Sequence, residues 1–446
     1  MKITIAGAGS VGFHLAELLS KENQDITLID INEDVLEQAM KSLDVMTIQG
    51  DASNMQVLEK LNLKKTNLFI AVTASEHSNL LAAILAKKLG AKNTIARIEN
   101  TENLGVEYKE AYNELGVDVL ISPQKLAALE IERLLKRASF TDMFEFEEGK
   151  ISVVGYTLDS SCPFINHTVG EVNSQPKDFQ FKGIALMRNH QTIIPDPNTV
   201  LQKGDHLYIA TENNSLESVM KFVGQQLKPI KRVMIVGCTP LALKTAQAIE
   251  QDYEVTVVIQ NEDIAKEFLE NLTNSLVVHA DPDDIDTLKS EGLENIDAFI
   301  ALTDNSETNI IASLMAEELG VYKTIALVEN VNYIRISQNI GIDTIINKKL
   351  IAANNIFRFV RKGKVEAIAS LHGVDAEIIE FTVHKNNRLV KHPISKLGLP
   401  QQSILAGVVR GDKSIVPTGD FTFELNDKVI ILALPKAIHA VEEIFK

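Results

Sequence analysis

The chain contains two copies of one long pattern, and this duplication limits its fold more than any other feature of its 446 residues. KITIAGAGSVGFHLAELL near the start corresponds to RVMIVGCTPLALKTAQAI, which aligns Gly7 with Gly237 at an offset of 230 (237 − 7). The same offset aligns LFIAVTASEHSNLLAAILAKKLGA with AFIALTDNSETNIIASLMAEELGV, and TIARIEN with TIALVEN. One offset held across separate blocks indicates a duplicated domain, so we expect both copies to share one fold.

Each copy alternates short apolar runs with helical patterns. In the first copy we expect the strands to be the apolar runs at 2–6, 25–30, 45–49, 68–72 and 94–98. Strands that alternate with helices predict a parallel sheet with right-handed crossovers. The predicted fold class is therefore α/β, with two Rossmann-like doubly wound parallel-sheet domains.

A different pattern follows each copy. MRNHQTIIPDPNTVLQKGDHLYIA matches VRGDKSIVPTGDFTFELNDKVIILA at an offset of 222, which pairs Arg188 with Arg410 (410 − 188). Short alternating runs with turn residues predict small α+β domains. The expected organisation is a Rossmann-like domain at 1–123, a connecting helix at 124–142, a small domain at 143–226, a second Rossmann-like domain at 230–348, a connecting helix at 349–364 and a small domain at 365–446.

The two connecting helices have apolar faces between the domains, within 124–138 and 349–362. Such a face can cross to another domain or subunit, or it can pack on the domain that precedes it. Both possibilities remain open from the sequence.

Charge and cysteine content exclude several classes of protein. The chain has 44 basic and 60 acidic residues, a net charge of −16, which argues against a main surface for nucleic acid or anionic lipid. Cys162 and Cys238 are too few for a disulfide framework or a zinc site, and we expect buried thiols in a reducing compartment. No apolar run reaches the ~18–20 residues that span a bilayer. We therefore expect a cytoplasmic protein without direct membrane insertion.

The turn GAGSVG after the first apolar run has the spacing of a nucleotide-binding turn. Gly7 allows the tight turn, Gly9 lets the backbone approach a pyrophosphate, and Gly12 allows the helix to pack closely on the strand. Amide groups at the helix start then hold phosphates, and the Ser10 hydroxyl can add a hydrogen bond. Asp30 ends the second strand, where a carboxylate binds ribose hydroxyls and repels a 2′-phosphate. NAD(H), ATP or ADP therefore fit better than NADP, and the alternative is a turn that serves packing alone.

Further candidates follow the other strands, at the edge where open α/β sheets bind ligands. Asp51 and Ala52 follow the third strand, and Thr73 and Ala74 follow the fourth. Asp51 can also cap the helix after it. Arg97 in the fifth strand either forms an ion pair with Glu99 or Glu102, or senses the charge of the nucleotide.

The second copy has lost most of these groups. The replacements are Thr239 for Gly9, Ala242 for Gly12, Gln260 for Asp30, Ala280 for Gly50, Pro282 for Ala52 and Leu327 for Arg97, while Asp51 is kept as Asp281. A β-branched residue is unfavourable where the backbone must approach a ligand. We expect one tight site per chain, with the second half weak or empty.

A dehydrogenase would need an acid–base group beside the transferred hydride. The candidates are His14, His77, His167 and His190, and none stands in a recognisable catalytic arrangement. The sequence has no P-loop, no HExxH and no paired metal-ligand spacing, and the small domains leave little room for a substrate cleft. This favours a nucleotide that acts as a signal, with an NAD-dependent oxidoreductase as the alternative.

MKITIAGAGSVGFHLAELL, TLIDINED, QGDAS, FIAVTASEHSNLLAAILAKKLGA and ARIEN resemble the N-terminal part of the regulator-of-potassium-conductance (RCK) domain. The alternation of large and small domains, twice over, resembles the TrkA family of Trk-system potassium uptake proteins across essentially the whole chain. The resemblance implies a non-enzymatic regulatory subunit on the inner face of the plasma membrane. It implies a homotetrameric ring that binds NAD(H), ATP or ADP and gates a TrkH-type membrane potassium transporter.

The resemblance also assigns roles within the site. It implies phosphate contacts from Gly7 to Val11, a ribose contact from Asp30, and contacts to the rest of the nucleotide from Thr73, Ala74 and Arg97. The complete set of candidate cofactor-binding residues is Gly7, Ala8, Gly9, Ser10, Val11, Gly12, Asp30, Asp51, Ala52, Thr73, Ala74 and Arg97. No catalytic residue and no metal ligand is expected.

Overall fold

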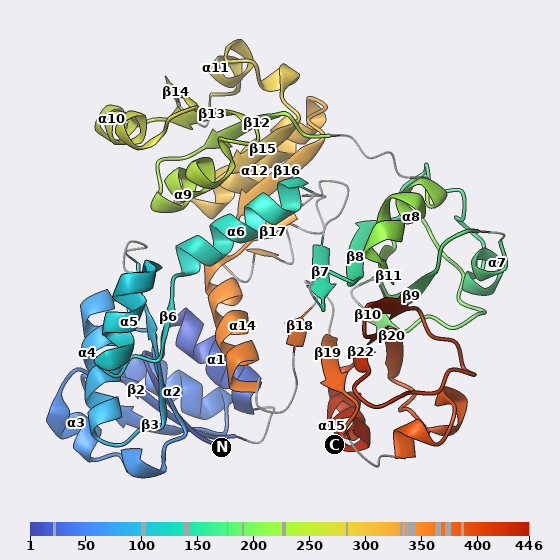
Figure 1. Cartoon of the computed structure of the whole chain (residues 1–446). Helices are drawn as coiled ribbons and strands as arrows, with labels where there is room; N and C mark the ends of the chain where they lie inside the picture. The colour runs from blue at the N-terminus through green and yellow to red at the C-terminus, as the bar shows by residue number, and fades with distance from the viewer. Residues whose placement is uncertain are drawn as a thin grey trace. The chain divides into compact units, whose positions relative to one another are not determined.

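The computed structural model divides into two compact units (Figure 1). Unit 1 combines Met1–Glu132 with Lys231–Val360, and unit 2 combines Arg133–Ile230 with Arg361–Lys446. The structure describes residues 1–20, 24–99, 104–136, 142–147, 149–175, 177–189, 191–224, 229–281, 284–330, 333–334, 337, 342, 344–361, 367–370, 376–384 and 388–445.

The first half of unit 1 is a six-stranded parallel sheet in the order β3-β2-β1-β4-β5-β6. Its strands are β1 (Lys2–Ala6), β2 (Asp25–Asp30), β3 (Met46–Gln49), β4 (Leu68–Ala71), β5 (Asn93–Arg97) and β6 (Val119–Ile121). Its helices are α1 (Ser10–Ser20), α2 (Glu33–Ser42), α3 (Met55–Glu59), α4 (Glu76–Lys88) and α5 (Val106–Glu114). The strand order reverses beside β1, and ligands of such sheets bind at this switch point.

The second half of unit 1 repeats this sheet in the order β14-β13-β12-β15-β16-β17. Its strands are β12 (Arg232–Val236), β13 (Glu254–Ile259), β14 (Leu276–His279), β15 (Ala298–Ala301), β16 (Lys323–Leu327) and β17 (Thr344–Ile346). Helices α9 (Pro240–Ile249), α10 (Glu262–Asn271), α11 (Ile285–Ser290) and α12 (Ser306–Glu318) accompany them. The predicted duplication and α/β class are confirmed.

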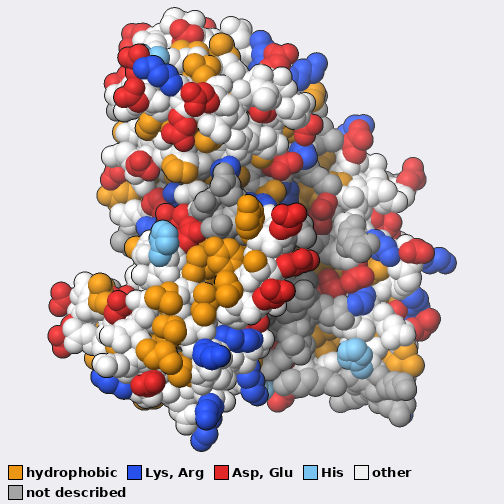
Figure 2. Space-filling model, turned by 60° about the vertical axis from the view of Figure 1, so that its left-hand side comes forward, with side chains coloured by type: hydrophobic (Ala, Val, Ile, Leu, Met, Phe, Trp, Pro, Cys, Tyr) orange, Lys and Arg blue, Asp and Glu red, His pale blue; other side chains and the backbone are white. Residues whose placement is uncertain are grey.

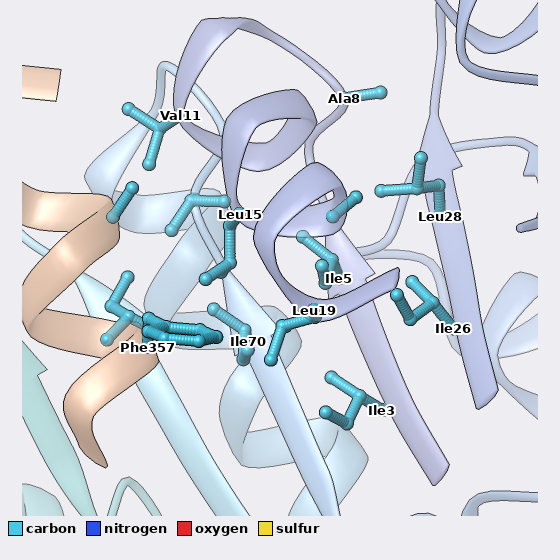
Figure 3. Close-up of a cluster of buried hydrophobic side chains, with 14 of the residues drawn as sticks. Ile3, Ile5, Ala8, Val11, Leu15, Leu19, Ile26, Leu28, Ile70 and Phe357 are labelled. Atoms are coloured by element: carbon cyan, nitrogen blue, oxygen red, sulfur yellow. The ribbon is translucent and has the colours of Figure 1, made fainter. Parts of the chain in front are cut away.

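Helices α6 (Pro123–Lys136) and α14 (Lys348–Arg361) follow the two sheets. Phe357 of α14, which follows the second sheet in the chain, is 2% exposed and lies in the core of the first half, beside Leu19 of α1 and Ile70 of β4 (Figure 3). Ala353 and Ile356 of α14 belong to the same cluster. Of the two possibilities that the sequence left open for this helix, crossing to the other domain is the one observed.

Unit 2 holds two five-stranded antiparallel sheets, in the orders β10-β9-β11-β8-β7 and β18-β19-β22-β20-β21. The first contains β7 (Asp142–Phe146), β8 (Ile151–Thr157), β9 (Phe181–Arg188), β10 (Gln191–Ile193) and β11 (His206–Glu212), with α7 (Val169–Asn173) and α8 (Leu216–Phe222). The second contains β18 (Ala367–Ser370), β19 (Glu377–Thr382), β20 (Ser403–Arg410), β21 (Lys413–Ile415) and β22 (Lys428–Ala433), with α15 (Pro435–Phe445). Small α+β domains after each Rossmann-type sheet agree with the prediction.

The two small sheets share one hydrophobic core. Val153 and Tyr208 of the first sheet and Ile378 and Ile430 of the second belong to a single cluster, and all four are fully buried. An arginine–aspartate pair recurs in both modules, Arg188–Asp205 at 2.6 Å and Arg410–Asp427 at 2.8 Å. The two offset copies of the small domain therefore pack on each other within one chain.

Two carboxyl groups meet across this contact. The buried Glu380 of β19 hydrogen bonds to the side chain of Glu147, which follows β7. Lys428 Nζ of β22 lies 3.7 Å from Glu147 Oε1. Burial and the neighbouring Glu147 carboxyl raise the pKa of Glu380 to about 8, because two carboxylates in contact must share a proton.

This pair predicts that unit 2 loses stability as the pH rises from about 4.5 to about 8. A carboxyl whose folded pKa is raised contributes stability that is present below its unfolded pKa and is lost as pH rises through about 8. We expect the free energy of unfolding to fall by roughly 1–3 kcal/mol between pH 6 and pH 9. Scanning calorimetry of the wild type and Glu380→Gln measures this, since the amide does not titrate. An equal pH dependence in both proteins would contradict the prediction.

In the part of the chain that is described, the structure contains no helix that is long and apolar enough to cross a membrane. No group of three or more His, Cys, Asp or Glu side chains among the described residues has the arrangement of a metal site. Cys162 is buried, as expected, but Cys238 is partly exposed, because it lies in the turn between β12 and α9.

Candidate nucleotide-binding site

A cavity of about 440 Å³ lies at the carboxyl ends of β1, β2, β4 and β5 in the first half. Its lining residues are Gly7, Gly9, Ser10, Val11, Ile29, Asp30, Ile31, Gly50, Asp51, Ala52, Val72, Thr73, Ala74, Ser75, Ser78 and Arg97. The structure thus brings together all the sequence candidates except Ala8 and Gly12, which are buried beside it. The cavity has the place and size of a small-ligand site in an open α/β sheet.

The fold requires glycine at two of the three glycine positions of the turn, for different physical reasons. Gly7 has φ +103°, and a Cβ there would lie 2.8 Å from the backbone nitrogen of Thr73. A Cβ at Gly12 would lie within hard contact of the Gly7 carbonyl oxygen, so α1 packs directly on the turn. Gly9 is different, because its φ is not left-handed and a Cβ would meet nothing within 4 Å. The fold itself therefore does not require glycine at position 9, and the space in front of it opens into the cavity.

Gly9 also leaves the start of α1 without a capping side chain. The first N–H groups of a helix have no partner within the helix. The first intrahelical bond here runs from Phe13 N to Gly9 O at 2.8 Å, so the amides of Ser10 to Gly12 come before it. These amides carry the positive end of the helix dipole and can bind an anion such as a phosphate.

The Asp30 carboxylate holds the glycine turn in place. Oδ2 accepts a hydrogen bond from Ala8 N at 2.7 Å, and Oδ1 accepts one from Asn32 N at 2.9 Å. A carboxylate can accept about four hydrogen bonds, so capacity for two ribose hydroxyls remains. The same negative charge opposes a 2′-phosphate.

Asp51 does not cap α3, contrary to one of its two possible roles. Its Oδ1 accepts from Ser53 N at 2.8 Å and from Ser53 Oγ at 2.7 Å, which forms a local turn. Asn54 is the residue that caps α3, through a bond from Gln56 N. Asp51 therefore orders the loop after β3 while it lines the cavity.

Asn79 was not identified from the sequence, yet it organises this edge of the site. Its side chain is 1% exposed, accepts from Thr73 N at 2.8 Å, and donates to Thr73 O at 3.1 Å and to Arg97 O at 3.0 Å. Asn309 makes the same set of bonds to Thr303 and Leu327 in the second half. The signal was available, because an asparagine stands at the same place in both aligned copies.

Arg97 forms the predicted ion pair with Glu99, and its side chain also lines the cavity. Its Nη2 lies 2.9 Å from Glu99 Oε1, and the side chain is 24% exposed and lines the cavity. The ion pair orients the guanidinium and leaves other N–H donors for an anion. The second possible partner, Glu102, lies outside the described residues.

In the second half, side chains of the protein itself form hydrogen bonds at the equivalent turn. Thr239 is 2% exposed, and its hydroxyl donates to Leu302 O at 2.8 Å and accepts from Ala242 N at 3.2 Å. It thereby caps α9 and occupies an amide that α1 leaves open. Gln260 Nε2 donates to Asp281 Oδ2 at 2.9 Å, and Leu327 is buried. Pro282 lies outside the described residues.

The three candidate histidines that the structure describes do not form a catalytic group at the cavity. His14 Nδ1 lies 3.5 Å from Glu17 Oε2 on α1, and His77 is exposed in the first turn of α4. His167 belongs to unit 2, where its Nδ1 lies 3.3 Å from Ile165 O. None of these three lines the cavity, and His190 lies outside the described residues.

The first half is a nucleotide-binding domain of the Rossmann type. It has a doubly wound sheet, a glycine turn after the first strand, and a carboxylate at the end of the second strand, where this class of domain binds ribose. The TrkA-N domain matches residues 3–123 and 233–348, and the TrkA-C domain matches residues 153–224 and 378–446. The chain belongs to the TrkA family of Trk-system potassium uptake proteins, and it contains the pair of TrkA-N and TrkA-C domains twice.

Relatives extend over the whole chain. It is 31% identical over 450 residues to the Trk system potassium uptake protein TrkA homolog of Archaeoglobus fulgidus, with 100% of both chains covered. It is 30% identical over 454 residues to TrkA of Vibrio alginolyticus, covering 100% of this chain and 99% of the relative.

Solved structures show the same fold at lower identity. The GsuK RCK domain has a TM-score of 0.60 at 14% identity, with 100% of this chain and 94% of that chain covered. The GsuK channel bound to NAD has a TM-score of 0.60 at 14% identity, with 100% of this chain and 78% of that chain covered.

Proposed function

We propose that this chain is the nucleotide-sensing regulatory subunit of a TrkH-type membrane potassium transporter. NAD(H), ATP or ADP binds in the first half and acts as a signal. The observation that carries the proposal is Gly9, where the fold needs no glycine and the cavity opens in front of the backbone. The GsuK channel bound to NAD, a protein of the same fold, supports a nucleotide as the ligand.

The chain binds the nucleotide with groups that it holds in fixed positions. The amides at the start of α1 bind the phosphates, Asp30 binds the ribose, and Arg97 lies within reach of a charged phosphate at the end of β5. The second half is weak or empty, since Thr239 caps α9 and Gln260 bonds to Asp281. We therefore expect one tight site per chain.

A signal acts only through a difference in affinity. A nucleotide shifts the protein between two shapes by the difference in its binding to each shape. ATP and ADP differ by one phosphate, so some group must distinguish the terminal phosphate. Among the described residues that line the cavity, Arg97 is the one basic side chain, and its ion pair with Glu99 orients its guanidinium.

An Arg97→Ala variant is expected to narrow the gap between ATP and ADP affinity. Loss of a charge-assisted hydrogen bond should weaken ATP binding about tenfold and ADP binding much less. Calorimetric titration with each nucleotide measures both values, and Arg97→Lys is the matched control that retains the charge. An unchanged ratio of the two affinities would remove Arg97 from this role.

The location and assembly follow from the same proposal. The chain lies in the cytoplasm, on the inner face of the plasma membrane, and contacts the membrane only through its transporter. Four chains would supply eight Rossmann-type domains to a ring. No nucleic acid takes part, and no observation favours the oxidoreductase alternative, since none of the three described candidate histidines lines the cavity.

Potassium flux tests the proposal. Proteoliposomes carrying the Trk membrane subunit from the same genome are loaded with ATP, ADP or NADH, with and without this chain. We expect the flux to depend on the nucleotide only when the chain is present. A flux that is indifferent to the chain and to the nucleotide would contradict the regulatory role.

A further inference from the structure

Four phenylalanine rings lie together in the first small module of unit 2 and are here called the aromatic cluster. The ring of Phe222, which ends α8, contacts the other three. Its centroid lies 4.6 Å from that of Phe164. It lies 5.6 Å from the centroids of Phe179 and Phe181. All four side chains are partly exposed and pack against the buried core of the module. Part of each ring is therefore open to a group that approaches from solvent.

The fold of the small module does not require these rings. The second small module has the same strand order, and β9 and β20 pair with β11 and β22 in the same register, which matches Phe181 with Ser403. The other three rings match aliphatic or polar residues, which are Leu389 for Phe164 (389 − 164 = 225, the offset of β8 and β19), Gln401 for Phe179 and Ile444 for Phe222 (both at 222). The second module forms its own buried core without these aromatic residues.

A lysine ammonium lies over the aromatic cluster. Lys177 Nζ is 4.2 Å from the ring centroid of Phe181 and 5.6 Å from that of Phe222. Both distances are within the ~6 Å range of a cation–π interaction. The second module has Leu399 at this position (399 − 177 = 222), so the cation and the rings are both particular to the first module.

Lys177 also differs from other cations of this chain in its partners. Figure 2 shows basic and acidic side chains interspersed over one face of the molecule. In the second module the Arg410 guanidinium lies 4.9 Å from the ring centroid of Phe421. Arg410 is held there by Asp427 at 2.8 Å and by Glu424 at 2.6 Å.

The Lys177 ammonium has no such carboxylate partner among the residues that the structure describes. Its one hydrogen bond there is long, from Nζ to Asn173 O at 3.5 Å. Burial lowers the pKa of the Lys177 ammonium, because the charge is partly removed from water. The ring faces are therefore the main groups that attract this cation.

We propose that the aromatic cluster binds an organic cation with a quaternary ammonium group, and that Lys177 occupies the site when this ligand is absent. Aromatic cages recognise quaternary ammonium groups, whereas a lysine ammonium is compact and strongly hydrated. The ligand therefore gives up less hydration than Lys177 does when it contacts the rings. Lys177 lies in the loop between α7 and β9, so its flexible side chain can leave the rings without a change in the sheet. The site belongs to unit 2 and goes beyond the proposed function, which uses the nucleotide cavity of unit 1.

Calorimetric titration of the full chain with choline chloride, at constant ionic strength, tests this proposal. While Lys177 covers the rings, the apparent affinity for choline is reduced by the fraction of molecules in which the site is open. We expect Lys177→Ala to bind choline at least about tenfold more tightly than the wild type. Addition of Phe222→Ile to that variant should weaken binding at least about fivefold. Isoleucine is the residue of the second module at this position, and Phe179→Gln, which also copies the second module, repeats the test at another ring.

The matched control is Phe421→Leu, which removes the ring beneath Arg410 and should leave choline binding unchanged. Dimethylbutanol, the neutral analogue with carbon in place of the quaternary nitrogen, should bind at least about tenfold more weakly than choline. The proposal is overturned if Lys177→Ala does not bind choline, if both ring variants keep full affinity, or if dimethylbutanol binds equally well. Binding of a lysine-rich peptide without binding of choline would also overturn it, because the rings would then serve a basic segment of a partner protein.

Discussion

A Gly9→Thr variant is expected to lose nucleotide affinity by at least about thirtyfold while its free energy of unfolding stays within about 0.5 kcal/mol of the wild type. The protein has space for this side chain, since a Cβ at position 9 meets nothing within 4 Å. Threonine caps a helix about as well as glycine, and Thr239 already does so in the second half. The loss of affinity arises because a branched side chain stands where the backbone meets the pyrophosphate, and because its hydroxyl occupies an amide of α1.

Calorimetric titration and urea denaturation of the same preparation measure the two quantities. The matched control is Thr239→Gly in the second half, which should leave the first site unchanged and create no second one, because Gln260 and Leu327 remain. A Gly9→Thr protein that binds nucleotide like the wild type would place the ligand away from the glycine turn.

A Phe357→Ala variant is expected to destabilise the first half of unit 1 by about 3–5 kcal/mol. Phe357 belongs to α14, which follows the second sheet, but its ring is buried in the core beneath α1 and β4. Removal of the ring leaves a cavity between α14 and two elements far from it in the sequence, α1 and β4. Urea denaturation measures the loss of stability, and hydrogen exchange of the β1 and β4 amides shows whether the first sheet has lost it.

Val360 supplies a comparison within the same helix. It is only partly buried against that cluster, so Val360→Ala should cost about 1 kcal/mol. If Phe357→Ala weakens only the second sheet and leaves β1 and β4 protected, then α14 does not cross between the halves.

The parallel sheets were predictable because their signals are local. Apolar runs and glycine turns mark each strand and helix without reference to distant residues, and the glycine turn with Asp30 marks the edge where the cavity lies. The weak or empty second site is a prediction that rests on Thr239 and Gln260. The structure adds a physical reason for this prediction, because both side chains form hydrogen bonds to other groups of the protein.

The features that sequence reasoning missed depend on contacts between distant segments. An apolar helix face does not say what covers it, so the crossing of α14 stayed open until Phe357 was seen in the first core. Asn79 reads as an ordinary helix residue, and only its bonds to Thr73 and Arg97 show that it joins two strand ends. The Glu147–Glu380 contact joins two modules far apart in the chain, and no local pattern marks it.

The central claim is that one nucleotide signals from the first half of each chain. Separate calorimetric titrations of NADH, NAD, ATP and ADP into the purified full chain test it most directly, with the absorbance of NADH followed in parallel. We predict about one nucleotide bound per chain, acceptance of several adenine nucleotides, and no consumption of NADH. Two equally tight sites per chain, or exclusive nicotinamide binding with redox turnover once a carbonyl substrate is added, would contradict it.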